Sequence, residues 1–402
     1  MFIKKKNKEV VKKDLYKKSA KLTKLLYLLS IILFITSLII NLIVFENDTS
    51  FSATMTYIIN ALSISLLAMP ISLNTLYITS FKDEENISHI KTIVTNIYDN
   101  KIIKRFKNAG INMIIINSKV SNPKIPMINE SEIALKKIKQ NIIINSDNLK
   151  IVNKYLNKET TYYEFENLEF AYQKILNARG IHDNYIRTIK YLITTYLPLI
   201  LSYLLLNIVG FPVEYNILLV ILLKVFTIIT CELVYKKMPY DIDIMERKPK
   251  PQNVFIGKQE IIFSIFESFL ILFVLNIPYM LILSQGGTNE FGNTLYYIIF
   301  IFINLYMTFS YFSERNILKN IFISLKNIRM IIFILSCIVI SLIFNFTTYF
   351  NTRNIYLHNF ISCMLFSLIA VSLNELIKFA RFTTTKGRKK YEHKNNKKYR
   401  RS

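Results

Sequence analysis

The sequence contains few of the residues on which several common classes of protein depend. Its three cysteines, Cys231, Cys337 and Cys363, all lie in apolar runs, and three are too few for a disulfide framework or a cysteine-rich zinc site. Eight glycines and nine prolines leave little material for glycine-rich loops that bind phosphates. Charged residues make up only 19% of the chain, against about a quarter in soluble domains. Together these deficits exclude an ordinary soluble globular protein and a disulfide-rich secreted one.

Hydrophobic residues, by contrast, are abundant. They form 52% of the 402 residues, and the mean hydropathy is +0.31. The 25 tyrosines and 29 phenylalanines, without any tryptophan, favour lipid-facing packing and interfacial belts over a cofactor site. The composition therefore predicts an integral membrane protein.

The apolar residues gather in runs of about twenty, which is enough for a helix to cross a bilayer core of about 30 Å. Residues 81–187 are different, because they are rich in Lys, Asn, Asp and Glu. Short isoleucine-rich runs at 113–116 and 142–144 predict buried strands there, and 133–140 and 168–177 predict helices. The eight expected spans cover residues 25–45, 55–79, 191–209, 217–234, 260–283, 294–312, 330–346 and 360–379.

The predicted fold class is therefore mostly α: a polytopic helical membrane bundle of about eight transmembrane helices, with a small cytoplasmic α/β lobe. Five segments are expected along the chain. They are a basic segment at 1–24, a transmembrane hairpin at 25–80, the lobe at 81–187, a six-helix bundle at 188–382 and a basic tail at 383–402.

The charges predict an orientation. Lys and Arg number 51 against 27 Asp and Glu, a net charge of +24. The basic residues gather at 1–24, 236–250, 315–329 and 386–401, whereas a loop such as 284–293 has none. By the positive-inside rule, both termini and the lobe face the cytoplasm of a multi-pass protein of the cell membrane. The basic tail directly follows a span, so we expect anionic lipid headgroups rather than nucleic acid as its partner.

Several segments resemble, in the same order, segments of P-type cation-transporting ATPases, the calcium and sodium/potassium pump group. Residues 241–249 read D-I-D-I-M-E-R-K-P, like the D-L-D-I-M-x-R-x-P that follows the sixth helix of those pumps. Residues 178–193 resemble the E-G-R…I-x-Y-L-I entry into the fifth helix, and 210–212 the G-x-P turn before the sixth. Residues 373–379 are similar to the D-E-x-x-K of the tenth helix, and 68–73 to the A-I-P-E-G-L of the fourth. The resemblance implies that the chain corresponds to the third to tenth pump helices, with 81–187 a reduced remnant of the phosphorylation domain.

The resemblance also exposes missing chemistry. Pumps of this family transfer the γ-phosphoryl group of ATP to the aspartate of a D-K-T-G-T motif, and no such motif occurs in these residues. The magnesium-binding T-G-D-G-x-N-D loop is also absent, and a trace of a related segment at 109–119 ends in Lys119, whose charge has the wrong sign for a metal ligand. Asp83 and Asp183 are alternative phosphate acceptors, but neither lies in a nucleotide or metal motif, so the interpretation as surface acids is favoured. We expect no catalysis by this chain alone and no bound cofactor.

The ion-binding positions implied by the resemblance have lost their carboxylates. A hard cation needs oxygen ligands to replace its water, and the pumps supply them from the fourth, fifth, sixth and eighth helices. The two positions of the fourth helix are Pro70 and Ile71. The remaining positions are occupied here by Tyr196, Leu199, Lys224, Thr227, Ile228 and Asn304.

Lys224 lies near the middle of a span, where a lone ammonium is costly. One hypothesis is that Lys224 is a tethered cation in the former ion site, paired with Glu232, Glu267 or Glu375. The alternative is that it snorkels or donates to backbone carbonyls freed by Pro70 and Pro198. The four histidines are scattered along the sequence, so we expect no metal site.

These observations predict a catalytically inactive pseudo-pump that acts as a scaffold, a regulator or a subunit for another membrane protein. Two alternatives remain open. The chain could be the membrane subunit of a split P-type ATPase coupled to ion or lipid transport. It could also be a transporter or channel that works without ATP.

Overall fold

The structure is a computed structural model, and its described residues fall into two units. We name these the sheet unit, residues 87–186 and 239–257, and the helical unit, residues 187–238 and 258–380. The described residues are 28, 31–32, 35, 87–95, 99–115, 142–145, 162–165, 167–211, 217–241, 244–249, 257–313, 317–348 and 350–380.

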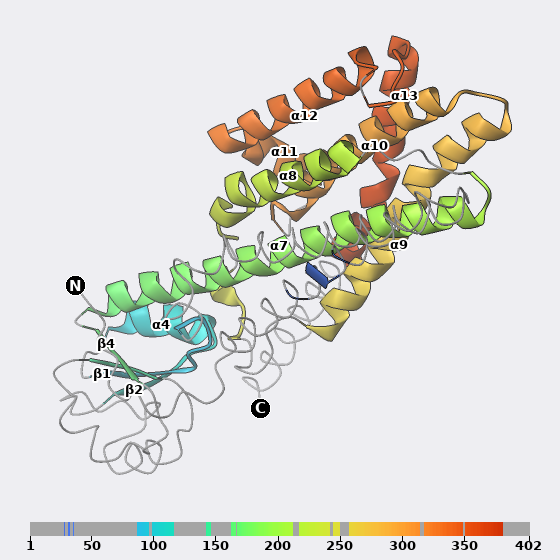
Figure 1. Ribbon diagram of the computed structural model, residues 1–402. Helices are drawn as coiled ribbons and strands as arrows, with labels where there is room; N and C mark the ends of the chain where they lie inside the picture. Colours follow the sequence, from blue (N-terminus) through green and yellow to red (C-terminus); the bar gives the residue numbers. More distant parts are fainter. Residues whose placement is uncertain are drawn as a thin grey trace, which may run out of the picture. The chain divides into compact units, whose positions relative to one another are not determined.

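The sheet unit contains a four-stranded parallel sheet in the order β2-β1-β3-β4 (Figure 1). Helix α4 connects β1 to β2, and the side chain of Asp99 caps it by accepting from the Lys101 amide at 2.8 Å. Ile93 of β1, Phe106 of α4 and Ile175 of helix α7 (Leu168–Ile208) are fully buried in one apolar core. The elements are β1 (Thr92–Thr95), α4 (Asn100–Asn108), β2 (Asn112–Ile115), β3 (Ile142–Asn145), β4 (Tyr162–Phe165) and the short helix η3 (Ile244–Glu246).

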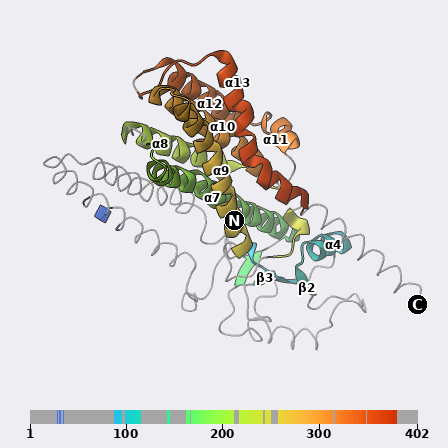
Figure 2. The same cartoon turned by 90° about the vertical axis from the view of Figure 1, so that its right-hand side faces the viewer.

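The helical unit is a bundle with helix α10 in its interior. Helices α9, α12 and α13 all pack against α10 (Figure 2). The elements are α7 (Leu168–Ile208), α8 (Ile217–Leu233), η2 (Tyr235–Lys237), α9 (Lys258–Ser284), α10 (Asn289–Tyr311), α11 (Ile317–Ser324), α12 (Ile328–Phe346) and α13 (Leu357–Ser367), and residues 369–380 are helical again.

Local sequence sets the ends of α9 and α10. Gly286 follows α9 with φ +79, a conformation that favours glycine, and the amide of Gly287 donates back to the carbonyl of Ile282 at 2.9 Å. Thr288 then caps α10 by accepting from the Phe291 amide. This tight connection makes α9 and α10 antiparallel neighbours.

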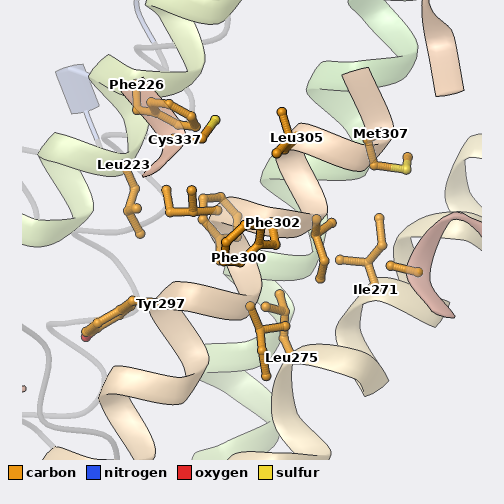
Figure 3. Close-up of a cluster of buried hydrophobic side chains, with 14 of the residues drawn as sticks. Leu223, Phe226, Ile271, Leu275, Tyr297, Phe300, Phe302, Leu305, Met307 and Cys337 are labelled. Carbon is orange, nitrogen blue, oxygen red and sulfur yellow. The ribbon is translucent and has the colours of Figure 1, made fainter. Parts of the chain in front are cut away.

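Large apolar side chains fill the space around α10. Phe300 and Phe302 of α10 lie among Leu223 of α8, Leu275 of α9 and Cys337 of α12 (Figure 3). Because α10 is buried on all sides over most of its length, its few polar side chains must find partners inside the bundle. These polar side chains define the candidate site.

Within the part of the chain that the structure describes, four helices are long and apolar enough to cross a membrane: Gln259–Ser284, Asn289–Tyr311, Ile328–Phe346 and Leu357–Ala380. They coincide with four of the eight spans expected from the sequence. The expected spans at 191–209 and 217–234 lie in α7 and α8 but are not among these four. The spans at 25–45 and 55–79 lie outside the described residues, apart from four isolated positions.

One boundary differs from the sequence prediction. A helix was expected to end at residue 177 and a separate span to begin at 191, but α7 is continuous over 41 residues. The intervening residues include no proline, and Gly180 lies within the helix, where the ring of Tyr240 occupies the space that a Cβ would take. A single helix therefore contributes residues to both units.

Candidate functional site

The expected eighth-helix ion position, Asn304, lies in the buried interior of the helical unit. Its side-chain oxygen accepts from the hydroxyl of Tyr191 at 2.8 Å and from that of Thr195 at 3.5 Å. Its side-chain nitrogen donates to the carbonyl of Phe300 at 2.8 Å. The amide thus uses its oxygen and one of its N–H groups within the protein, in place of contacts to an ion.

Neighbouring side chains extend this arrangement. The ring of Tyr191 stacks on that of Tyr235, with centroids 4.7 Å apart. The hydroxyl of Tyr235 donates to that of Thr308 at 3.5 Å, and Thr308 in turn donates to the carbonyl of Asn304 at 2.8 Å. We call these residues the Asn304 cluster: Tyr191, Thr195, Tyr235, Asn304 and Thr308. All five side chains are neutral, so the cluster offers a cation no carboxylate.

The side chains at the other described ion positions also pack or form hydrogen bonds within the protein. Leu199 is buried in the apolar core, as is the ring of Tyr196. The hydroxyl of Thr227 donates to the carbonyl of Leu223 at 2.9 Å, one turn earlier in α8. Such bonds to the preceding turn satisfy a hydroxyl without any ligand.

Five of the predicted residues cannot be placed in this way. Lys224, Ile228 and Glu232 lie in helix α8, but the structure describes only their backbone. Pro70 and Ile71 lie outside them altogether. Pairing of Lys224 with a carboxylate therefore stays a prediction.

Glu267, one of the proposed partners of Lys224, is buried in α9 and bonded elsewhere. Its Oε2 accepts from the hydroxyl of Tyr311 at 2.6 Å. Its Oε1 lies beside a cavity of about 30 Å³ and has no hydrogen-bond partner among the described residues. A cavity of this size suits one or two water molecules.

The charges around this cavity are mixed. Arg187, Lys190 and Lys378 line it together with Glu260 and Glu267, and Lys190 lies 3.9 Å from Glu260. Because three basic groups already face two carboxylates, an additional metal cation gains little there. The cavity is therefore better suited to water than to a metal ion.

Glu375, the other described partner proposed for Lys224, forms an ion pair within its own helix. Its Oε1 lies 2.8 Å from the ammonium of Lys378 and accepts from the hydroxyl of Ser310 at 2.6 Å. Its Oε2 accepts from the amide of Ile317 at 2.9 Å, at the start of α11. Lys378 also donates to the carbonyl and the hydroxyl of Ser310. Glu375 and Lys378 lie in the helix Leu357–Ala380, which we call the last helix. The segment resembling D-E-x-x-K thus joins the last helix to the end of α10 and the start of α11.

A second side chain closes the end of α10. The side-chain nitrogen of Asn320 donates to the carbonyls of Phe309 at 2.9 Å and Ser313 at 3.1 Å, and its oxygen accepts from the hydroxyl of Ser313 at 2.6 Å. Since the last carbonyls of a helix have no partner within the helix, Asn320 acts as a C-terminal cap supplied by α11.

In the sheet unit, Arg179 joins three of the segments that resemble the pumps. It donates to the carbonyls of Ala109 at 3.1 Å, Ile244 at 3.4 Å and Arg247 at 3.0 Å. Burial lowers the pKa of Arg179 to about 10, with Asp183 opposing the shift, so it stays charged at neutral pH. The segments around residues 109, 179 and 244–247, distant in sequence, therefore meet at one guanidinium.

Arg247 reinforces the same place. Its guanidinium lies 3.0 Å from the carboxylate of Asp183 and 2.9 Å from that of Asp241. Asp183, weighed above as a phosphate acceptor, is thus an ion-pair partner of Arg247. Asp83, the other candidate, lies outside the described residues.

Two of the four histidines, distant in sequence, lie together in space. The rings of His89 and His182 lie edge to face in the sheet unit, with centroids 5.3 Å apart. Among the described residues, no three His, Cys, Asp or Glu side chains lie close enough together to hold a metal ion.

Sequence reasoning missed most residues that organise these sites, above all Tyr311, Ser310, Asn320 and Arg179. A signal was available for the first three, because polar side chains inside or next to apolar spans need partners. Arg179 was noticed only as part of a motif that resembles the pumps, and no sequence pattern indicated the carbonyls that it contacts.

Part of the chain matches a known protein family. Residues 212–380 match the family model described as Cation transporting ATPase, C-terminus. This match confirms the resemblance inferred from residues 241–249 and 373–379. No curated protein matches the chain. With four helices able to cross a membrane, the chain is an integral membrane protein with a region similar to the C-terminal part of cation-transporting ATPases.

Proposed function

We propose that the chain is a catalytically inactive pseudo-pump, which acts as a scaffold or regulator of another membrane protein. The observation that carries the proposal is the Asn304 cluster. A residue in the position of an ion-binding carboxylate is a neutral amide, and its oxygen already accepts from Tyr191. A dehydrated cation would have to displace this bond and would receive no formal charge in return.

The proposal includes the arrangement expected from the sequence. In it, about eight helices cross the membrane, the sheet unit is a cytoplasmic remnant of the phosphorylation domain, and both termini face the cytoplasm. Partners are membrane lipids with anionic headgroups and a second membrane protein. These 402 residues contain no D-K-T-G-T motif, which supports a role without phosphoryl transfer.

Radioactive calcium binding and flux test the proposal. The purified chain in liposomes should show no saturable calcium binding, no phosphoenzyme with labelled ATP and no cation uptake, while an active cation-transporting ATPase serves as the positive control. Cross-linking in native membranes should yield a stoichiometric complex with a membrane protein. Uptake of a cation driven by ATP with the chain alone would refute the pseudo-pump.

A split ATPase is the second candidate, and the Arg179 contacts favour it. A pump must couple its phosphorylated domain to its helices, and Arg179 fastens residues 244–247 to α7 within the sheet unit. If a co-purified partner carries D-K-T-G-T and the complex transports ions or lipid, this candidate replaces the first. An ATP-independent transporter or channel would instead show flux in liposomes without any partner.

A further inference from the structure

Helix α11 buries its two neutral polar side chains, while two of its large apolar side chains are exposed. Asn320 and Ser324 are both 0% exposed, whereas Leu318 is 64% exposed and Phe322 is 72% exposed. A helix on the surface of a soluble protein shows the opposite pattern, with its apolar face against the core. An apolar environment around Leu318 and Phe322 would account for this exposure.

The orientation of α11 is fixed by the contacts already described. Asn320 caps the end of α10, and the amide of Ile317 donates to Glu375. The hydroxyl of Ser324 donates to the carbonyl of Ile321 at 2.8 Å, which satisfies it inside the protein. Because these bonds hold the polar face inward, the helix cannot rotate to bury Phe322 without breaking the cap of α10.

The apolar face continues beyond α11 into a membrane-spanning helix. Leu325, in the turn that follows α11, and Ile328, the first residue of α12, are both exposed. On α12, one of the four helices able to cross a membrane, Ile332 and Leu335 are also exposed. The surface that lipid tails cover on α12 is thus continuous in sequence with the outer face of α11.

Basic residues accompany this face. Lys319 and Lys326 are exposed and Arg329 is partly exposed, and the described residues 317–329 include no acidic side chain. Long basic side chains at a membrane surface extend their charged ends to the headgroups while their methylene stems stay apolar. A helix with an outward apolar face and basic neighbours is typical of a segment that lies in the interface plane.

We propose that α11 lies in the membrane interface, with Leu318 and Phe322 inserted at the boundary of headgroups and acyl chains, and that Lys319, Lys326 and Arg329 bind the phosphates of anionic lipids. The site would recruit acidic phospholipid to the junction of α10, α11 and the last helix. This inference rests on the part of the proposed function that names anionic lipids as partners, and it holds whether or not the chain is a pseudo-pump.

The lack of tryptophan in the chain makes a direct test possible. Phe322→Trp introduces a single tryptophan on the outer face of α11, which can be excited at wavelengths where the 25 tyrosines do not absorb, and the protein is placed in nanodiscs of phosphatidylcholine. One tenth of the lipid is then replaced by brominated phosphatidylcholine or by brominated phosphatidylglycerol, since bromine quenches only fluorophores that it contacts. Phe273→Trp, on the exposed side of α9, is the control for lipid contact, and Phe170→Trp, exposed in the sheet unit, is the control for water.

We expect brominated lipids to quench Phe322→Trp about as strongly as Phe273→Trp, and aqueous iodide to quench mainly Phe170→Trp. Brominated phosphatidylglycerol should quench Phe322→Trp more than brominated phosphatidylcholine, with an apparent affinity at least about fivefold higher. Adding Lys319→Gln, Lys326→Gln and Arg329→Gln should abolish that difference. Brominated phosphatidylserine should behave like phosphatidylglycerol, because the shared chemistry is the anionic phosphate lipid.

Two results would overturn the proposal. Quenching of Phe322→Trp by iodide but not by brominated lipid would place α11 in water. Equal quenching by both lipids, unchanged by the three glutamine substitutions, would remove the anionic-lipid site. If Phe322→Trp does not fold, Leu318→Trp on the same face gives the same readout.

Discussion

The ion pair between Lys378 and Glu375 offers the sharpest test of how the helical unit is held together. Lys378 is buried, and its ammonium contacts Glu375 at 2.8 Å and the hydroxyl and carbonyl of Ser310. The substitution Lys378→Met keeps the length of the side chain and removes its charge. It leaves Glu375 without its cation and removes the donor to the Ser310 carbonyl at the end of α10.

The size of the effect follows from these contacts. Two unit charges 2.8 Å apart attract by about 6 kcal/mol at an effective dielectric constant of about 20, and desolvation of both groups offsets much of this. Breaking such a pair by removing one partner costs about 3–5 kcal/mol. Glu375 keeps its bonds from Ser310 and the Ile317 amide, so we expect the lower value, about 3 kcal/mol. For a unit of about 200 residues this lowers Tm by about 6–12 °C.

The three free cysteines supply the assay. Cys231, Cys337 and Cys363 are buried, so a dye that fluoresces on reaction with thiols reports unfolding without any added label. Lys237→Met, at an exposed lysine, is the matched control and should change stability by less than about 0.5 kcal/mol. In the double variant with Glu375→Gln, the loss should be smaller than the sum of the two single losses, because the two residues share one interaction. A shift for Lys378→Met no larger than that for Lys237→Met would refute the reasoning.

Three other substitutions test the remaining contacts. Asn304→Leu leaves the hydroxyl of Tyr191 without its acceptor and should cost about 1–3 kcal/mol in the same thiol assay, whereas no loss would contradict the Asn304 cluster. Arg179→Met leaves three carbonyls without their donor, so proteolysis within residues 239–257 should become faster. Arg179→Lys should not restore the resistance, because one ammonium cannot replace a planar fork of donors. Restored resistance in the lysine variant would contradict the role of the guanidinium. Gly180→Ala places a methyl group 2.1 Å from the ring of Tyr240, so hydrogen exchange of residues 239–241 should rise as the ring is displaced, and unchanged exchange would show that the contact is not tight.

The apolar helices were predictable because their signal is local. Runs of about twenty apolar residues form helices wherever they meet a bilayer, and the expected spans near α9, α10, α12 and the last helix agree with the structure within a few residues at most ends. Helix α10 begins five residues earlier than expected, at Asn289, because Thr288 caps it and polar residues can occupy a first turn.

The continuity of α7 was not predictable from hydropathy alone. The polar residues between 177 and 191 interrupt the apolar pattern, which predicts that a helix ends there. They stay helical because they face two different environments in succession, first the sheet and then the bundle core, and no residue among them breaks a helix. Periodicity detects one buried face, and it fails where the buried face changes its partner.

The sequence by itself determined that this protein is an integral membrane protein, and the motifs at 241–249 and 373–379 determined which family its later helices resemble. Composition and short motifs suffice for this, because the bilayer imposes length and apolarity on each helix independently of the others. Only the tertiary structure decided which polar side chains satisfy one another. Asn304 accepts from Tyr191, 113 residues away, and Lys378 contacts Ser310, 68 residues away. Such pairings depend on where α7, α10 and the last helix come together, and no local pattern records that.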